Sequence, residues 1–90
     1  MPVRTPPTLV ALEKTTWAKE FKADSLVSYK TALQYALQDQ LSVLIERTLD
    51  SGEPVWAVRV LDDPEFWMDA KPTKAQAMAV CQEMGWTIEH

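Results

Sequence analysis

The residues of this chain that could do chemistry are few: one cysteine, one histidine and a short acidic run. Cys81 falls among apolar residues at helical spacing, which is typical of a buried cysteine, because reactive thiols need partly exposed and electropositive surroundings. His90 stands at the end of the chain, where termini are commonly mobile. Catalysis needs a nucleophile or an acid–base pair with tuned neighbours, so we predict that the chain is not an enzyme.

The acidic run is Asp62-Asp63-Pro64-Glu65, with Asp69 further on. Carboxylates suit hard cations, but the run lacks the ligand spacing and central glycine of a calcium-binding EF-hand loop. The chain has two glycines, which cannot form a glycine-rich phosphate loop. We therefore predict no metal site and no cofactor, and we interpret the acidic residues as a solvated surface.

An aromatic side chain and a guanidinium group form the best binding candidate. Trp67 and Arg59 are expected on neighbouring strands and on the same face of a sheet, and tryptophan and arginine are enriched at binding hot spots. The residues that we predict to bind a partner are Trp67, Arg59, Glu46 and Asp69. In the alternative arrangement, the N-terminal segment folds back and Trp17 or Phe21 covers Trp67.

A meander of three strands is expected to position these residues, at 41–49, 55–61 and 65–69. The linking segments, 50–54 and 62–64, contain the Asp, Gly and Pro residues that favour turns. Alternation along the strands predicts one apolar face covered by helices, built from Val43, Ile45, Leu49, Trp56, Val58, Val60, Phe66 and Met68. The opposite face is mixed in character and carries the candidate residues.

Two helices are expected on either side of the meander. The first starts at Asp24-Ser25 or at Ser28 and runs to about residue 39. Its apolar stripe consists of Leu26, Tyr29, Leu33, Ala36 and Leu37. The second opens with the capping-box pattern Thr73-Lys-Ala-Gln76, runs to about Met84 and stops at Gly85. Residues 86–90 then alternate as in an edge strand.

The N-terminal part is less determined by its pattern. Three prolines within residues 1–7 predict an extended arm. Residues 8–22 are compatible with a strand, a helix or an irregular wrap. We therefore predict an α+β fold, a small two-layer sandwich of order α-β-β-β-α-β, in which an antiparallel sheet of three to four strands carries two helices on one face. Residues 1–24 form the arm, and residues 25–90 form a single domain.

Composition limits the classes of protein. Ninety residues suit one domain, and a hydrophobic fraction of 47% argues against disorder. One cysteine permits no internal disulfide, and the sequence has no apolar run long enough to cross a membrane. The first residues lead us to expect no leader peptide. We expect a cytoplasmic protein. Residues 50–70 carry six acidic side chains against Arg59, which disfavours nucleic acid at this end because phosphates require basic residues.

The order helix, three antiparallel strands, helix resembles the double-stranded RNA-binding domain over residues 25–84. Lys71-Pro72-Thr73-Lys74-Ala75, at the start of the last predicted helix, is similar to the basic start of the second helix of that family. The lysine cluster of the family is reduced here to Lys71 and Lys74. The resemblance implies nucleic-acid binding as an alternative function.

The function that we predict is that of a non-catalytic protein-binding or regulatory domain of a bacterial or phage type. It would act through an exposed sheet face or edge, with another protein or a second copy of the chain as partner. Nucleic-acid binding is the main alternative, and a small enzyme is the third.

Overall fold

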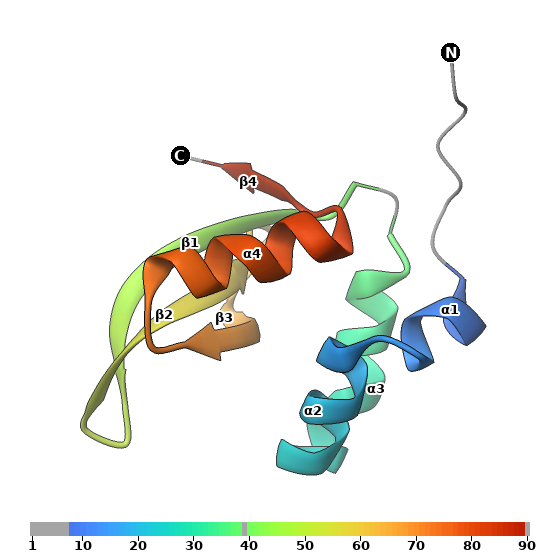
Figure 1. The fold of residues 1–90 in the computed structure, drawn as a ribbon, viewed down its shortest axis with the longest axis horizontal. Coiled ribbons are helices and arrows are strands. Elements are labelled where there is room, and N and C mark those ends of the chain that lie inside the picture. Colours follow the sequence, from blue (N-terminus) through green and yellow to red (C-terminus); the bar gives the residue numbers. More distant parts are fainter. Residues whose placement is uncertain (1–7, 39, 90) are drawn as a thin grey trace. The chain divides into compact units, whose positions relative to one another are not determined.

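The computed structural model describes residues 8–38 and 40–89 (Figure 1). Within these residues the fold is α+β, with four helices and a mixed four-stranded sheet, and its element order contains the predicted order α-β-β-β-α-β. The chain divides into two compact units, Met1–Asp39 and Gln40–His90. The division thus falls after residue 39 and not after residue 24. The extended arm predicted for residues 1–7 lies outside the described residues.

The first unit is helical. Its helices are α1 (Leu9–Glu13), α2 (Thr16–Asp24) and α3 (Leu26–Ala36). Residues 8–22, for which the sequence left three conformations open, therefore form α1 and α2. Helix α3 begins directly after Ser25, one of the predicted caps, although the Ser25 side chain makes no capping hydrogen bond. The helix ends at Ala36, a few residues before the predicted end.

Threonine side chains cap the N-termini of α1 and α2. The hydroxyl of Thr8 accepts a hydrogen bond of 3.2 Å from the amide of Ala11, at the start of α1. The hydroxyl of Thr15 accepts one of 3.1 Å from the amide of Ala18 and donates one of 2.6 Å to the carbonyl of Leu12. Thr15 therefore binds the end of α1 and the start of α2 at once. These bonds satisfy amides that have no partner within a helix.

The core of the helical unit is built mainly from small residues. Its buried members are Leu12, Trp17, Ala18, Ala32 and Ala36. The predicted stripe on α3 is partly wrong, because the side chain of Leu26 is 68% exposed. Leu37 is also exposed, at 38%, whereas the burial of Ala36 agrees with the predicted stripe and Ala32 is buried although it lies outside that stripe. The expectation that Trp17 is covered is confirmed.

The second unit contains the sheet. Its elements are β1 (Ser42–Asp50), β2 (Glu53–Val60), β3 (Asp63–Lys71), α4 (Lys74–Met84) and β4 (Thr87–Glu89). The strand order is β3-β2-β1-β4, and the first three strands form the predicted antiparallel meander. Strand β4 is at the predicted edge but runs parallel to β1. Helix α4 returns the chain to the end of the sheet at which β3 began, so β4 must run in the direction of β3 and β1.

The turn between β1 and β2 is tighter than predicted. Asp50 pairs with Glu53, which leaves Ser51 and Gly52 as a two-residue turn. Both have positive φ, 53° and 85°, the combination that defines a type I′ hairpin and that favours glycine. Pro54 was expected to stop the ladder but lies inside β2. It is located beyond the last pair of β2 with β3, where its missing amide proton is not needed.

Helix α4 has the predicted ends. The hydroxyl of Thr73 accepts a hydrogen bond of 3.2 Å from the amide of Gln76. Gly85 has a left-handed φ of 75°, and the amide of Trp86 donates to the carbonyl of Cys81 at 2.9 Å. This is the helix stop that glycine favours, and it leads the chain directly into β4.

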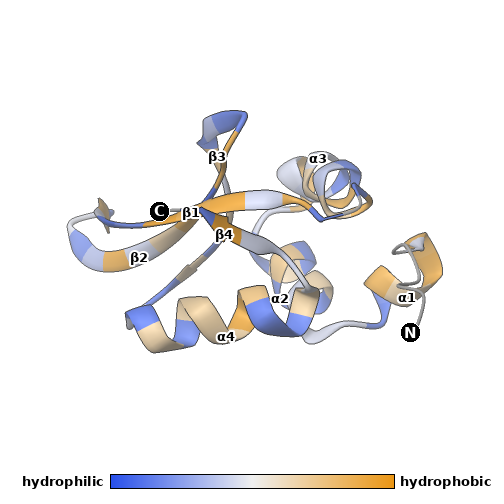
Figure 2. Ribbon diagram, turned by 90° about the horizontal axis from the view of Figure 1, so that it is seen from above, coloured by the Kyte–Doolittle hydropathy of each residue, from blue (hydrophilic) through white to orange (hydrophobic). Residues whose placement is uncertain are grey.

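Helix α4 lies along one face of the sheet and contacts all four strands (Figure 1). Figure 2 shows that hydrophobic and hydrophilic residues alternate along it. The buried residues of this unit are Leu41, Val43, Ala57, Val58, Val60, Met68, Ala77, Cys81 and Trp86. The predicted burial of Val43, Val58, Val60 and Met68 is confirmed. Leu49, at the far end of β1, is 65% exposed. The placement of the 26–36 helix on the sheet stays a prediction.

Candidate functional site

Arg59 is the centre of the predicted binding residues. It pairs directly with Trp67 on β3, and its guanidinium carbon lies 5.5 Å from the centroid of the Trp67 ring. Its Nε lies 3.7 Å from Oε2 of Glu46 on β1, and its Nη1 donates a 3.3 Å hydrogen bond to the carbonyl of Pro64. The structure therefore brings together three of the four predicted residues, Glu46, Arg59 and Trp67, on three adjacent strands.

The Arg59 side chain is held in place while its neighbours stay accessible. The side chain of Glu46 is 53% exposed and that of Arg59 is 22% exposed, and Trp67 is half-buried. The Nε atom of Arg59 is buried and makes no hydrogen bond among the described residues. The Glu46 carboxylate, 3.7 Å away, lies beyond hydrogen-bonding distance of this atom. A partner that excluded water would strengthen this ion pair, because electrostatic attraction grows in a drier environment.

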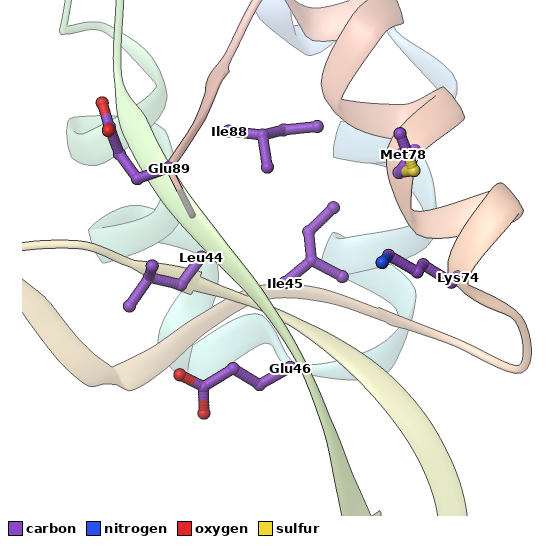
Figure 3. A pocket seen from close by; sticks show the side chains of 7 residues that line it. All are labelled: Leu44, Ile45, Glu46, Lys74, Met78, Ile88 and Glu89. Carbon is purple, nitrogen blue, oxygen red and sulfur yellow. The ribbon is translucent and has the colours of Figure 1, made fainter.

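A cavity of about 230 Å³ lies beside Glu46, at the edge of β1 (Figure 3). Its lining residues come from β1, α4 and β4: Leu44, Ile45, Glu46, Lys74, Met78, Ile88 and Glu89. In Figure 3, Ile45, Met78 and Ile88 are located on the α4 side of β1, and Glu46 and Glu89 lie on the other side. Sequence reasoning missed this cavity, because it depends on the short pairing of β4 with β1.

Asp69 does not belong to the predicted surface. A β-bulge in β3 places Asp69 opposite Val58 but Trp67 opposite Arg59. Residues directly opposite each other point to the same face of a sheet, so Asp69 and Trp67 point to opposite faces although they are two positions apart. The prediction that they share a face is wrong, because it assumed unbroken alternation along β3.

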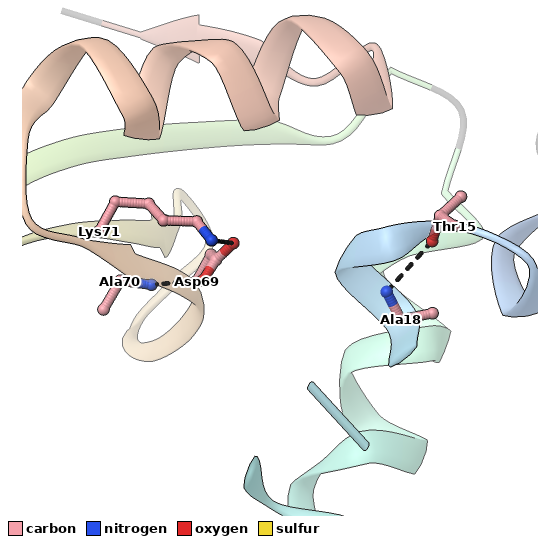
Figure 4. Close-up of polar contacts among 5 residues, drawn as sticks. All are labelled: Thr15, Ala18, Asp69, Ala70 and Lys71. Atoms are coloured by element: carbon pink, nitrogen blue, oxygen red, sulfur yellow. Dashed lines mark hydrogen bonds and ion pairs between the residues drawn. The ribbon is translucent and has the colours of Figure 1, made fainter. Parts of the chain in front are cut away.

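Asp69 is engaged within its own unit (Figure 4). One carboxylate oxygen accepts a 2.8 Å hydrogen bond from the amide of Ala70, and the other lies 3.7 Å from Nζ of Lys71. Its charge also acts on Cys81 in α4, which agrees with a position on the helix-covered face. These contacts indicate a structural role for Asp69.

Cys81 is fully buried. Burial raises the pKa of the thiol from 9.0 to about 11, and the negative charge of Asp69 contributes to the rise. A thiol with a raised pKa stays neutral at pH 7, whereas nucleophilic attack requires the thiolate. The geometry of Cys81 therefore supports the interpretation that it is a core residue.

The raised pKa of Cys81 predicts a loss of stability at alkaline pH. The folded state holds the proton more tightly than the unfolded state, so the stabilisation is complete below pH 9 and is lost as the pH rises towards 11. We expect a decrease of roughly 2 kcal/mol in the free energy of unfolding over this range. Urea unfolding at several pH values measures it. Cys81→Ala is the control, and an equal alkaline loss in this variant would contradict the prediction.

The two lysines that carry the resemblance to the RNA-binding family both make contacts within the sheet unit. Nζ of Lys71 pairs with Asp69 at 3.7 Å. Nζ of Lys74 lies 5.7 Å from the centroid of the Trp56 ring, which also shows that Trp56 faces α4 as predicted. The basic start of α4 is thus partly engaged by its own unit.

Within residues 8–38 and 40–89, no three His, Cys, Asp or Glu residues are grouped so that they could hold a metal ion. In the same part of the chain, no helix is both long enough and apolar enough to cross a membrane. His90 lies outside the described residues.

Comparison with known proteins adds no assignment. No family model matches the sequence, and the comparisons with curated proteins and with solved structures found no match. The function must therefore be argued from the residues themselves.

Proposed function

We propose that this chain is a non-catalytic protein-binding or regulatory domain. Its binding surface is the sheet face formed by Glu46, Arg59 and Trp67, which we call the arginine patch. The observation that carries the proposal is the position of Arg59, which lies beside the Trp67 ring and within ion-pair distance of Glu46. A cytoplasmic location stays a prediction from the sequence.

The chemistry of the patch supports this role. Arginine and tryptophan dominate binding hot spots because they combine a large contact area with directional hydrogen bonds. The contacts of Arg59 with Pro64 and Glu46 limit the side-chain freedom that it would lose on binding, which lowers the entropic cost of association. The neighbouring contacts of Lys71 and Lys74 offer less support for nucleic-acid binding, which relies on lysines that are available to phosphates.

We expect Trp67→Ala to weaken partner binding by about 2 kcal/mol or more, as for a hot-spot residue. Its cost to stability should be smaller, about 1 kcal/mol, because the ring is half-buried and its contact with Arg59 is partly exposed. The measurement is affinity capture from cells that express the chain, quantified by mass spectrometry, together with a thermal melt of each variant.

Two further variants make this test specific. Arg59→Lys keeps the charge but loses the planar guanidinium, so it should also reduce capture. Leu61→Ala changes a 39% exposed residue outside the patch and should capture the same proteins as the unchanged chain. If Trp67→Ala and Arg59→Lys capture the same proteins in the same amounts as Leu61→Ala, the proposal is wrong.

A further inference from the structure

Most of the outer edge of β1 is not paired within the described sheet. Strand β4 pairs with β1 only up to Leu44, which lies opposite Glu89, whereas β1 continues to Asp50. On this side of β1, no other described strand lies beside residues 45–50. An exposed strand edge is a template for pairing with another chain.

The backbone groups of this edge point outward in a defined order. The carbonyl of Leu41 accepts a hydrogen bond of 2.8 Å from β4, and that of Ser42 accepts one of 3.0 Å from the chain after β2. Because these directions alternate along a strand, the backbone groups of Ile45, Arg47 and Leu49 are directed to the open edge. A segment in extended conformation could form hydrogen bonds with all three.

The cavity adds a requirement on the side chains of such a segment. It extends around the edge, with the apolar Ile45, Met78 and Ile88 and the cation Lys74 on the α4 side of β1. Leu44 and the carboxylates of Glu46 and Glu89 are on the other side (Figure 3). Successive residues of a strand point to opposite faces. One residue of an added segment would therefore meet mainly apolar side chains. The next would lie near the carboxylates of Glu89 and Glu46, the second of which also pairs with Arg59.

A second copy of this chain is a poor occupant. Antiparallel pairing of two β1 edges around a twofold axis at residue 46, 47 or 48 brings residues of like charge together, and an axis at Leu49 leaves only residues 48–50 of the open edge paired. An axis at Glu46 or at Arg47 places that residue opposite its own copy, and an axis at Thr48 places Glu46 opposite Asp50. Like charges directly opposite each other destabilise a strand pair. The occupant must instead supply positive charge.

We propose that the open edge of β1 binds an extended segment of another protein, in which an apolar residue is followed by a lysine or an arginine. The segment adds a strand beside residues 45–50, places its apolar side chain in the cavity and its basic side chain between Glu46 and Glu89. This mode of recognition takes affinity from backbone hydrogen bonds and specificity from alternate side chains. The inference rests on the proposed protein-binding role, and its site adjoins the arginine patch and shares Glu46 with it.

The test uses a fluorescein-labelled peptide of about six residues in which valine and lysine alternate. Fluorescence anisotropy should show binding to the full chain, and NMR spectra should show amide shifts centred on residues 45–50. A control peptide in which valine and glutamate alternate should bind more weakly. Equal binding of both peptides, or binding of neither, overturns the proposal, as does a dimer of the chain through this edge in light scattering.

Variants separate the charge from the backbone. Glu89→Lys, at an exposed residue, should lower the affinity for the lysine peptide roughly fivefold, as expected for the loss of an exposed ion pair. The same variant should raise the affinity for the glutamate peptide. Leu49→Pro removes an outward amide at an edge that tolerates proline. This variant should lower the affinity for both peptides. Leu49→Ala keeps the amide and should leave both affinities unchanged. Unchanged affinity in Glu89→Lys and Leu49→Pro contradicts the proposal.

The arginine patch and the edge share Glu46, but residues outside this overlap distinguish them. Trp67→Ala should leave the affinity for the lysine peptide within about twofold, because Trp67 does not line the cavity. A loss of peptide binding in Trp67→Ala would place the peptide on the patch and overturn the edge proposal. Failure of the peptide to bind leaves the patch to be judged by the capture experiment with Trp67→Ala and Arg59→Lys.

Discussion

Met68→Ala is expected to destabilise the sheet unit by about 2 to 5 kcal/mol, the range observed when a large buried side chain is truncated to alanine. Met68 is fully buried and lies in the bulge of β3, between the residues opposite Val58 and Arg59. The flexible methionine side chain suits an irregular space of this kind. Urea unfolding followed by tryptophan fluorescence measures the change.

Two controls define the cause of this loss. Met68→Leu keeps most of the volume and should cost less than about 1.5 kcal/mol. Leu49→Ala truncates a residue of the same sheet that is 65% exposed and should change stability by about 0.5 kcal/mol or less. If Met68→Ala is as stable as Leu49→Ala, the bulge does not depend on this side chain.

Trp17→Ala is expected to cost the helical unit about 3 to 5 kcal/mol, as for other buried tryptophans. Trp17 is 4% exposed, and its ring lies 5.7 Å from that of Phe21 between centroids. Most of the other buried residues of this unit are alanines, which contribute little apolar area, so the unit depends strongly on this one side chain. A loss of helical signal in circular dichroism should follow.

Val27→Ala provides the matched control in the same unit. Val27 is 93% exposed, and alanine favours a helix more than valine does. Its stability should therefore equal or slightly exceed that of the unchanged chain. The stability of Trp17→Phe should lie between that of Trp17→Ala and that of Val27→Ala. A helical signal and a melting temperature that are unchanged in Trp17→Ala would show that the helices do not need the ring.

The parts of the fold that could be predicted are those fixed by local pattern. The Thr73 cap and the Gly85 stop determine α4, and alternating residues with turn signals determine the three-strand meander. The parallel direction of β4 could not be predicted from residues 86–90, because it follows from where α4 delivers the chain. The conformation of residues 8–22 could not be decided from the sequence, because the spacing of the apolar residues Trp17 and Phe21 is compatible with several conformations.

The candidate site was predictable to the extent that its strands are regular. Glu46 and Arg59 lie on β1 and β2, whose pairing continues without interruption up to the type I′ turn, so alternation placed them correctly. Asp69 was misplaced because a bulge leaves no clear mark in a sequence of this length. The unpaired edge of β1 could not be predicted for another reason. It depends on β4, which within the described residues pairs with β1 only at Ser42, Val43 and Leu44.

The bulge in β3 has a consequence for how this sheet can tolerate change. It puts Trp67 and Asp69 in opposite phase, so that Trp67 belongs to the open face and Asp69 to the face beneath α4. A second register shift separates Trp67, opposite Arg59, from Asp63, opposite Val60. Removing one residue between Trp67 and Asp69 would restore the regular phase and bring one of these two side chains to the wrong surface. Substitutions of Trp67 and of Asp69 are therefore decoupled: Trp67 can vary without disturbing the helix-covered face, while the residue at Asp69 must keep fitting beneath α4.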